Sequence, residues 1–417
     1  MSEYLNNKDH KQQVLKGLIK DLHSGRDFNE VKREFGNLIR EVDATEIAHM
    51  EQELISEGMN PEEIKKMCDV HAAVFRETLM QNEQPQLIPG HPLHTLKHEN
   101  DEARKTLESI GSKLDKLANT TDGRQEASTL RGLKDDLKYF SQNLDKHFSK
   151  KENIFFPYLE KRNITGPPSV MWSVDDEIRD MVKELAKAIG RLEPGSGREA
   201  HSEALQSFSR MKEKVTEMFF KEENILTPMM INALSEEEWA EIKDHSSDEF
   251  GVIFTDPGPD LWKPRATYKP SAAPLMDGGA IDLDTGSLTP AEINAILTNL
   301  PVDVTFVDNN DVVKYFSQGK DRIFTRTKSI IGRKVQNCHP PESVHVVNRI
   351  VTDFKTGKHD HAEFWLELNG QFIHIRYLAL KDERGEHLGT MEVTQDLTRL
   401  RALQGERRLL QYEDMRH

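Results

Sequence analysis

The chain has 417 residues, which is too many for one ordinary hydrophobic core, so we expect two or three domains. It carries 71 acidic and 56 basic residues, and the formal net charge of −15 argues against nucleic acid or an anionic membrane surface as a direct partner. Cys68 and Cys338 are the only cysteines, so a disulfide framework is excluded and a reducing cytoplasm is the simplest location. Because no apolar run approaches the roughly 18 residues of a membrane span, and the N-terminus has no signal-peptide core, we expect neither.

Residues 1–82 have the pattern of an all-helical domain. The stretch "VLKGLIKDLH" has helical apolar spacing, and Asp43 with Glu46 has the spacing of a helix N-terminal capping box. Residues 86–250 continue with four long helical pieces, separated by "NTTDG", "RNITGPPS" and "EPGSG". Four helices joined by short loops predict an up-down four-helix bundle.

Composition changes after residue 250. Residues 251–288 are rich in proline and glycine and lack apolar periodicity, which predicts a flexible linker. In residues 289–400, Thr289 begins a capped short helix, and the following pattern predicts two strands, helices and then three antiparallel strands. Residues 401–417 repeat leucines at helical spacing, which predicts an output helix that pairs two chains into a homodimer.

Three resemblances follow from these segments. The closing stretch "TQDLTRLRALQGERRLL", with a D-x-T signature at Asp396 and Thr398, resembles the end of a PAS sensory domain. Residues 86–250 resemble the hemerythrin-like (HHE cation-binding) bundles, and "LISEGMNPEEIKKMCDVHAAVF" resembles the domain of unknown function 438 that precedes such bundles in bacteria. The resemblance implies a multidomain fold, with an all-α N-terminal region and hemerythrin-like bundle followed by an α+β PAS domain.

Two stretches of the middle segment are duplicates. "DKHFSKKENIFFPYLEK" at 145–161 and "TEMFFKEENILTPM" at 216–229 align at an offset of 223 − 152 = 71. Prolines align at the ends of both stretches, and we expect them to end two helices. The second stretch lies on a core seam made of Phe208, Met211, Val215, Met218, Glu222, Ile225 and Met229. At this offset a histidine of the first stretch faces a methionine, and a lysine faces a glutamate.

The hemerythrin resemblance implies six inward ligand positions, two on the second helix of each half and one on the first. Here these positions hold Asn100, His147, Lys151, Asp175, Met218 and Glu222. Only His147, Asp175 and Glu222 are ordinary metal ligands, and the family pattern has His rather than Asp at position 175. This departure argues against a full di-iron site.

Two interpretations of these residues remain open. In the first, Lys151 replaces a metal cation and pairs with Asp175 and Glu222, because a lone buried ammonium is costly. In the second, Lys151 extends outward while His147, Asp175 and Glu222 hold iron or another metal in a mononuclear or dinuclear site. Glu152 or Glu223 would then complete the ligand set; alternatively, either glutamate is a solvated charge at a helix end.

A second set of histidines lies in "GHPLHTLKHEN". His91, His94 and His98 share one helical face and have metal-ligand spacing, but this face lies opposite the core seam. They would face solvent or the N-terminal domain, where Cys68 and His71 offer further ligands. The simpler interpretation is a buried thiol and a histidine cluster at a domain interface.

PAS cores often hold a haem, a flavin or a small metabolite. His339, His345 and His374 are the candidate haem ligands, and a core filled by side chains or an unknown small ligand is the alternative. We find no Gly-rich phosphate loop, Ser/His/Asp set or kinase motif. The sequence therefore predicts a sensor of oxygen, nitric oxide, redox state or iron that signals through a protein partner. The alternatives are a non-haem iron protein in oxidant detoxification or iron–sulfur repair, and a metal-free interaction scaffold.

Overall fold

The computed structural model describes residues 17, 21, 24–27, 30, 88–120, 122–264, 280–319, 322–406 and 408. Most of the predicted domain 1–82, with Cys68 and His71, lies outside the described residues, as does most of the predicted output helix 401–417. The chain forms two compact units. The first comprises Met1–Ser271, Thr327–Arg333 and Asn337–Ser343, and the second comprises Ala272–Arg326, Lys334–Gln336 and Val344–His417.

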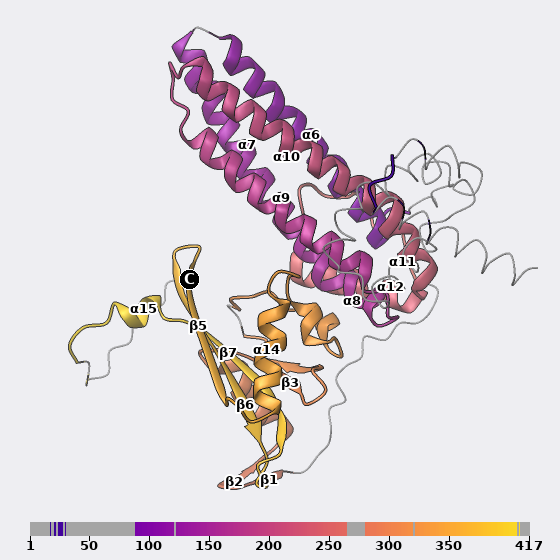
Figure 1. Cartoon of the computed structure of the whole chain (residues 1–417), viewed down its shortest axis with the longest axis vertical. Coiled ribbons are helices and arrows are strands. Elements are labelled where there is room, and N and C mark those ends of the chain that lie inside the picture. The colour runs from indigo at the N-terminus through magenta and orange to yellow at the C-terminus, as the bar shows by residue number, and fades with distance from the viewer. Residues whose placement is uncertain are drawn as a thin grey trace, which may run out of the picture. The chain divides into compact units, whose positions relative to one another are not determined.

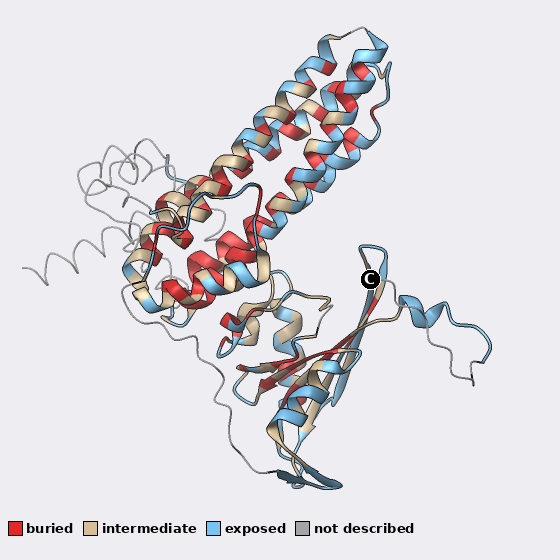
Figure 2. Cartoon of the chain, turned by 180° about the vertical axis from the view of Figure 1, so that it is seen from behind, coloured by how far each residue is buried: buried red, intermediate tan, exposed pale blue. Residues whose placement is uncertain are grey.

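Four long helices dominate the first unit (Figure 1). They are α6 (Pro92–Asn119), α7 (Gly123–Lys150), α9 (Gly166–Gly190) and α10 (Arg198–Lys221). Each of α6 and α9 packs against both α7 and α10. Figure 2 shows that their buried residues follow stripes along the inner faces, as apolar side chains repeating every three or four residues require. We refer to these four helices as the bundle.

The second helix of each half continues through a π-helix. Helix α7 runs into η1 (Lys151–Phe155) and α8 (Phe156–Glu160), and α10 runs into η2 (Glu222–Leu226) and α11 (Thr227–Ala233). Pro157 and Pro228 therefore lie at the start of the continuing helices, so the prediction that they end two helices is wrong. A π-helix adds one residue to a turn, which moves the buried position from Ile225 to Leu226.

Side chains satisfy the backbone groups that Pro157 leaves without a donor. Proline has no N–H for the carbonyl groups of Glu152 and Asn153, which lie five and four residues before it. Within the same unit, Arg333 donates to the Glu152 carbonyl at 3.2 Å and Thr327 donates to the Asn153 carbonyl at 2.7 Å. These contacts remove the cost of leaving two buried carbonyl groups unpaired.

The end of the first helical region folds back on its beginning. Helix α12 (Glu236–Phe250) begins with a capping box, and the segment 251–264 follows it. Ile253, Phe254 and Trp262 are buried in this segment, and the Trp262 N–H donates to the Pro89 carbonyl at 2.9 Å. Residues 251–264 thus differ from the linker expected at 251–288, because they contribute to the core. Residues 265–279 lie outside the described part of the chain.

The second unit is built on an antiparallel sheet with the strand order β4-β3-β7-β6-β5. Its strands are β3 (Asp303–Asp308), β4 (Val313–Phe316), β5 (His361–Leu368), β6 (Gln371–Lys381) and β7 (His387–Asp396). The 3-10 helices η3 (Lys328–Ile330) and η4 (Val335–Cys338) and helix α14 (Val344–Lys355) lie between β4 and β5 in sequence. The predicted order of two strands, helices and three antiparallel strands is confirmed.

Smaller elements flank this sheet. A hairpin of β1 (Ile281–Leu283) and β2 (Gly286–Leu288) precedes α13 (Pro290–Asn299), which begins at the predicted Thr289 cap. After β7, the Asp396 carboxylate accepts from the backbone N–H of Thr398 at 2.8 Å, and α15 (Thr398–Arg401) follows. Among the described residues, none of the helices has the length and apolar character needed to cross a membrane.

Candidate functional site: a buried ion cluster in the bundle

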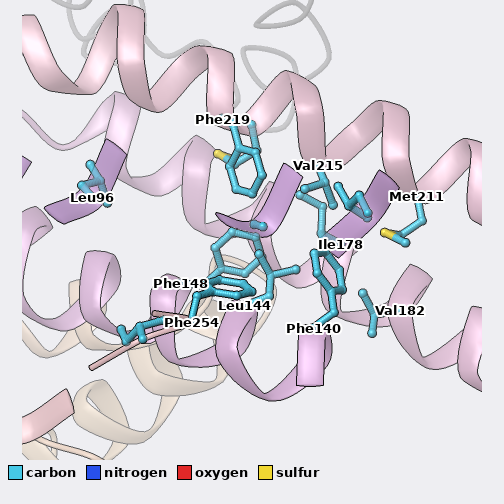
Figure 3. Packing of buried hydrophobic residues seen from close by; sticks show 14 of the residues in the cluster. Leu96, Phe140, Leu144, Phe148, Ile178, Val182, Met211, Val215, Phe219 and Phe254 are labelled. Atoms are coloured by element: carbon cyan, nitrogen blue, oxygen red, sulfur yellow. The ribbon is translucent and has the colours of Figure 1, made fainter. Parts of the chain in front are cut away.

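Charged side chains meet inside the bundle where its core seams are otherwise apolar. His147 lies in the last turn of α7, Lys151 begins η1, Asp175 lies on α9 and Glu222 begins η2. All four are buried, with at most 1% of each residue exposed. The sequence predicted each as an inward position, because apolar residues three and four positions away fix the face of each helix. Figure 3 shows the surrounding core, in which Phe148 and other apolar side chains pack.

Lys151 contacts two carboxylates at once. Its ammonium donates to Asp175 Oδ1 at 2.9 Å and to Glu222 Oε1. The same nitrogen lies 4.6 Å from the centre of the Phe148 ring, where a cation is attracted by the negative face of the aromatic system. Burial lowers the pKa of Lys151, but the two carboxylates outweigh burial and raise it. Lys151 is therefore a charged ammonium at the centre of the cluster.

His147 joins this group to a second one. Its Nε2 lies 3.1 Å from Glu222 Oε2, and its Nδ1 lies 2.7 Å from Glu99 Oε2. Burial lowers the pKa of His147, but Glu222 and Glu99 outweigh burial and raise it. The imidazolium form, in which both ring nitrogens donate, satisfies both carboxylates.

Glu99 and Lys150 are the two members of the cluster that the sequence interpretation missed. Both are buried, and the Lys150 ammonium donates to Glu99 Oε1. Lys150 and His147 together hold the pKa of Glu99 below its ordinary value despite complete burial. The sequence did contain a signal that Glu99 faces the core. Glu99 lies four residues before the core residue Ala103, and Asn100 lies three residues before Ala103, so all three share one face of the helix.

The carboxylates of the cluster differ in their affinity for protons. Burial raises the pKa of Glu222, but Lys151 and His147 outweigh it and lower the pKa to about 2. Burial raises the pKa of Asp175 well above its ordinary value, and repulsion from Glu152 and Glu222 adds to this effect. Among the described residues, Asp175 Oδ2 has no hydrogen-bond partner, so it is the oxygen on which a proton would reside.

The flanking glutamates turn to arginines rather than to the centre. Arg179 donates to both oxygens of Glu152, at 2.8 and 3.1 Å. In the other half, Arg104 forms an ion pair with Glu223 Oε1 at 2.8 Å, and the Asn100 amide donates to the same oxygen at 3.3 Å. Neither glutamate is a solvated helix-end charge, since Glu152 is buried and Glu223 is half-buried.

The two arginines reveal the internal repeat in three dimensions. Arg179 lies over the Phe148 ring at 5.5 Å, and Arg104 lies over the Phe219 ring at 5.3 Å. The arginines are separated by 179 − 104 = 75 residues, and the rings by 219 − 148 = 71. An arginine, a glutamate and a phenylalanine therefore form the same set of contacts in each half. The halves differ at the centre, where Lys151 faces Glu222.

This arrangement does not fit a bound metal ion. His147 holds protons on both nitrogens in its imidazolium form and has no lone pair for a metal, and both Glu222 oxygens accept from side-chain cations. Within the described ranges, no group of three His, Cys, Asp or Glu side chains has the geometry to hold a metal. The position between Asp175 and Glu222 is taken by the Lys151 ammonium.

The histidines at the start of α6 do not converge on one point. His91 caps α6 by accepting from the Leu93 N–H at 3.2 Å, and its ring lies 4.8 Å from both Trp239 and Trp262. Burial, with His94 and Lys243 nearby, lowers the pKa of His91 to about 4.

The other two histidines of this set have separate surroundings. His98 Nε2 lies 2.9 Å from the Thr255 hydroxyl, and His94 Nδ1 is buried with no hydrogen-bond partner among the described residues. His91 and His98 thus contact the 251–264 segment or α12 rather than a shared centre. The proposal that these three bind a metal together with Cys68 and His71 involves residues outside the described ones.

The candidate haem ligands do not all belong to one unit. His339 belongs to the first unit, whereas His345 and His374 belong to the second. His374 Nε2 lies 3.0 Å from Glu363 Oε2 on the neighbouring strand, and the adjacent Ile373 and Ile375 are buried. Since side chains alternate along a strand, His374 is on the face opposite those two residues. A haem bound by these histidines stays a prediction.

Three family models match the chain in succession. The family of unknown function DUF438 matches residues 15–81, the hemerythrin HHE cation binding domain matches residues 91–230, and a PAS domain matches residues 293–398. A comparison with curated proteins finds no match.

Several solved structures are similar to parts of the chain. A C-terminal domain from Streptococcus mutans is 29% identical, with 29% of this chain and 95% of that chain covered and a TM-score of 0.29. A sensory box sensor histidine kinase from Vibrio cholerae is 14% identical, covering 26% and 90% with a TM-score of 0.21. A PAS domain from Colwellia psychrerythraea is 12% identical, covering 26% and 97% with a TM-score of 0.22. The chain is therefore a multidomain protein with a DUF438 segment, a hemerythrin HHE segment and a PAS segment, in that order.

Proposed function

We propose that the chain is a cytosolic sensory or regulatory protein in which side-chain cations of the hemerythrin-like bundle take the place of a bound metal. The observation that carries this proposal is the position of the Lys151 ammonium between Asp175 and Glu222. Under this proposal the bundle has a structural or interaction role, and the PAS segment takes part in recognising a signal or a partner.

The charges of the cluster support this proposal. Lys150, His147 and Lys151 alternate with Glu99, Glu222 and Asp175 along one connected chain of contacts. Burying a charge without a partner costs several kcal/mol, whereas a paired and hydrogen-bonded charge is tolerated. A divalent metal added to this chain would place further positive charge beside three cations. The three side-chain cations therefore supply the positive charge that a metal would otherwise supply.

The sensory role rests on the combination of segments. A PAS segment follows the bundle in the same chain, and the sequence has no kinase or nucleotide-binding motif of its own. An effect on other molecules would then pass through a protein partner or through self-association. The signal would be oxygen, nitric oxide, redox state, iron or a small metabolite.

Metal titration of charge-reversal variants tests the proposal. Lys151→Glu brings a third carboxylate to Asp175 and Glu222, so we expect a destabilised bundle whose melting temperature rises when iron(II) or zinc is added. Wild-type protein should show no such rise. Lys146→Glu serves as the matched control, because Lys146 is an exposed lysine in the last part of α7, and this variant should behave like wild type. A saturable, stoichiometric rise in the wild type would overturn the proposal.

The match to a hemerythrin HHE cation binding domain favours a second candidate, a non-haem iron protein in oxidant detoxification or iron–sulfur repair. This candidate requires iron bound to the purified chain and turnover of hydrogen peroxide or oxygen. Consumption of either oxidant by wild-type protein, lost in His147→Ala, would favour this second candidate. Equal background rates in wild type and His147→Ala would favour the sensory proposal.

A further inference from the structure

A cavity of about 310 Å³ lies beside the ion cluster, within the first unit. Its walls come from the start of α6, the end of α7, helix α12 and the segment 251–260. Glu99 and Lys150 line it, and both are buried, with 1% and 2% of each residue exposed. The cavity is therefore one contact away from His147, since Glu99 bonds to that histidine.

The wall formed by the 251–260 segment is held in place from several sides. Gly90 has a φ of 90°, and a Cβ there would lie 2.3 Å from Asp260 Oδ1, so only glycine permits this close approach. Asp260 forms ion pairs with Lys243 on α12 and with Lys263. The Leu261 N–H also donates to the Pro89 carbonyl at 3.0 Å. This wall of the cavity is thus fixed by backbone and side-chain contacts.

The negative groups of the cavity already have partners. Glu99 Oε1 accepts from Lys150, and Glu99 Oε2 accepts from His147. Asp260 Oδ1 accepts from Lys243, and Asp260 Oδ2 accepts from Lys263 at 2.9 Å. A cation entering the cavity would have to break one of these pairs. The lining therefore does not favour a cation.

The two lysines that line the cavity, in contrast, have N–H groups that no acceptor among the described residues receives. An ammonium has three N–H groups. Lys150 has one hydrogen-bond acceptor among the described residues, Glu99, and lies over the Phe155 ring at 6.0 Å. Lys243 has two acceptors among those residues, the Asp260 carboxylate and the Trp262 carbonyl. Because a buried N–H without an acceptor is costly, the buried Lys150 ammonium makes the cavity suited to a molecule that brings acceptor oxygens, and the partly exposed Lys243 offers a second donor.

We infer that this cavity binds a small organic carboxylate, whose oxygens accept hydrogen bonds from Lys150 and Lys243. The apolar lining residues Val252 and Ile253 would contact the carbon part of such a ligand. The inference does not depend on the proposed sensory role, since it rests on the N–H groups of two lysines that line the cavity. Binding would also stabilise the first unit, because the lining residues come from separate helices and meet only in the folded chain.

Calorimetric titration of the full chain with propionate and with succinate tests this inference. Inorganic phosphate and chloride at matched ionic strength serve as probes for an adventitious anion effect. We expect one carboxylate per chain with a dissociation constant in the millimolar range or below, and no saturable heat from phosphate or chloride. Absence of saturable carboxylate binding, or equal binding of phosphate, would overturn the inference.

Two variants and one control variant localise the binding. Val252 lines the cavity and is 60% exposed, whereas Leu261, which is 62% exposed, lies on the same segment outside the lining. Val252→Trp should fill the entrance and weaken carboxylate binding by about tenfold or more, and Leu261→Trp should leave it unchanged. Lys243→Gln should also weaken binding by removing the charge of one donor. Equal affinity in wild type, Val252→Trp and Lys243→Gln would place the carboxylate elsewhere and refute the inference.

Discussion

Replacing Lys151 by methionine should destabilise the bundle strongly, because it removes the cation from a buried pair while leaving the carboxylates in place. The pKa of Glu222 is about 2 against an ordinary 4.5, a difference of 4.5 − 2 = 2.5 units. At about 1.4 kcal/mol per unit, the partners of Glu222, after offsetting the opposing effect of burial, favour its charged form by a net of roughly 3–4 kcal/mol. Lys151 shares this effect with His147 but is also the partner of Asp175. We therefore expect a loss of about 3–5 kcal/mol in the free energy of unfolding, as for other broken buried pairs.

Urea unfolding followed by far-ultraviolet circular dichroism measures this loss. Lys146→Met, which removes an exposed lysine from the same helix, should change the free energy of unfolding by less than about 0.5 kcal/mol. The double variant Lys151→Met/Glu222→Gln should recover part of the loss, since it no longer leaves Glu222 charged and without Lys151. A Lys151→Met protein as stable as the Lys146→Met control would refute the assignment of Lys151 as a structural cation.

Four further predictions follow from the same structure and sequence. The pKa of His147 is raised, so its contribution to stability should be complete below about pH 6.5 and be lost as the pH rises through the folded-state value; His147→Gln should flatten this alkaline limb of the urea midpoint against pH. The pKa of Glu222 is lowered to about 2, so its contribution should be lost as the pH falls from about 4.5 towards that value, and Glu222→Gln should remove this acid limb. Limited proteolysis should cut first within 265–279, whose sequence is rich in proline, glycine and alanine, and first cuts within the bundle would contradict this boundary. Removal of residues 400–417 should weaken a homodimer, and an unchanged sedimentation coefficient would count against pairing through this end.

The inward faces of the bundle helices could be predicted from sequence because apolar spacing is a local signal. Phe208, Met211, Val215 and Met218 lie on the predicted seam and are buried. The same signal placed the four central charged residues, since a polar residue in phase with an apolar seam must face the core. The succession of strands and helices along the second unit followed from alternation and turn residues, which are also local.

The partners of the charged residues could not be predicted in the same way. Lys150 and Glu99 lie 51 residues apart and meet only when α6 and α7 pack together. Arg179 reaches Glu152 across two helices for the same reason. Sequence patterns report which face a residue occupies on its own helix, and they carry little information about the side chain it meets on another.

The π-helices and the segment after α12 were missed for different physical reasons. Pro157 is a signal for a helix end, but Thr327 and Arg333 satisfy the carbonyl groups it leaves free, so the helix continues. The segment 251–264 has the composition of a linker, yet Phe254 and Trp262 bury their rings. A few large aromatic residues can hold such a segment in place without any periodic pattern.

The metal content of freshly purified wild-type protein tests most directly whether Lys151 takes the place of a metal. The protein should be purified without chelators and without oxygen, and iron, zinc and manganese should then be measured per chain by elemental analysis. If the Lys151 ammonium occupies the position between Asp175 and Glu222, we expect far less than one metal per chain and a melting temperature that is unaffected by a chelator. Near-stoichiometric iron or zinc in the wild type, lost in His147→Ala, would contradict this assignment.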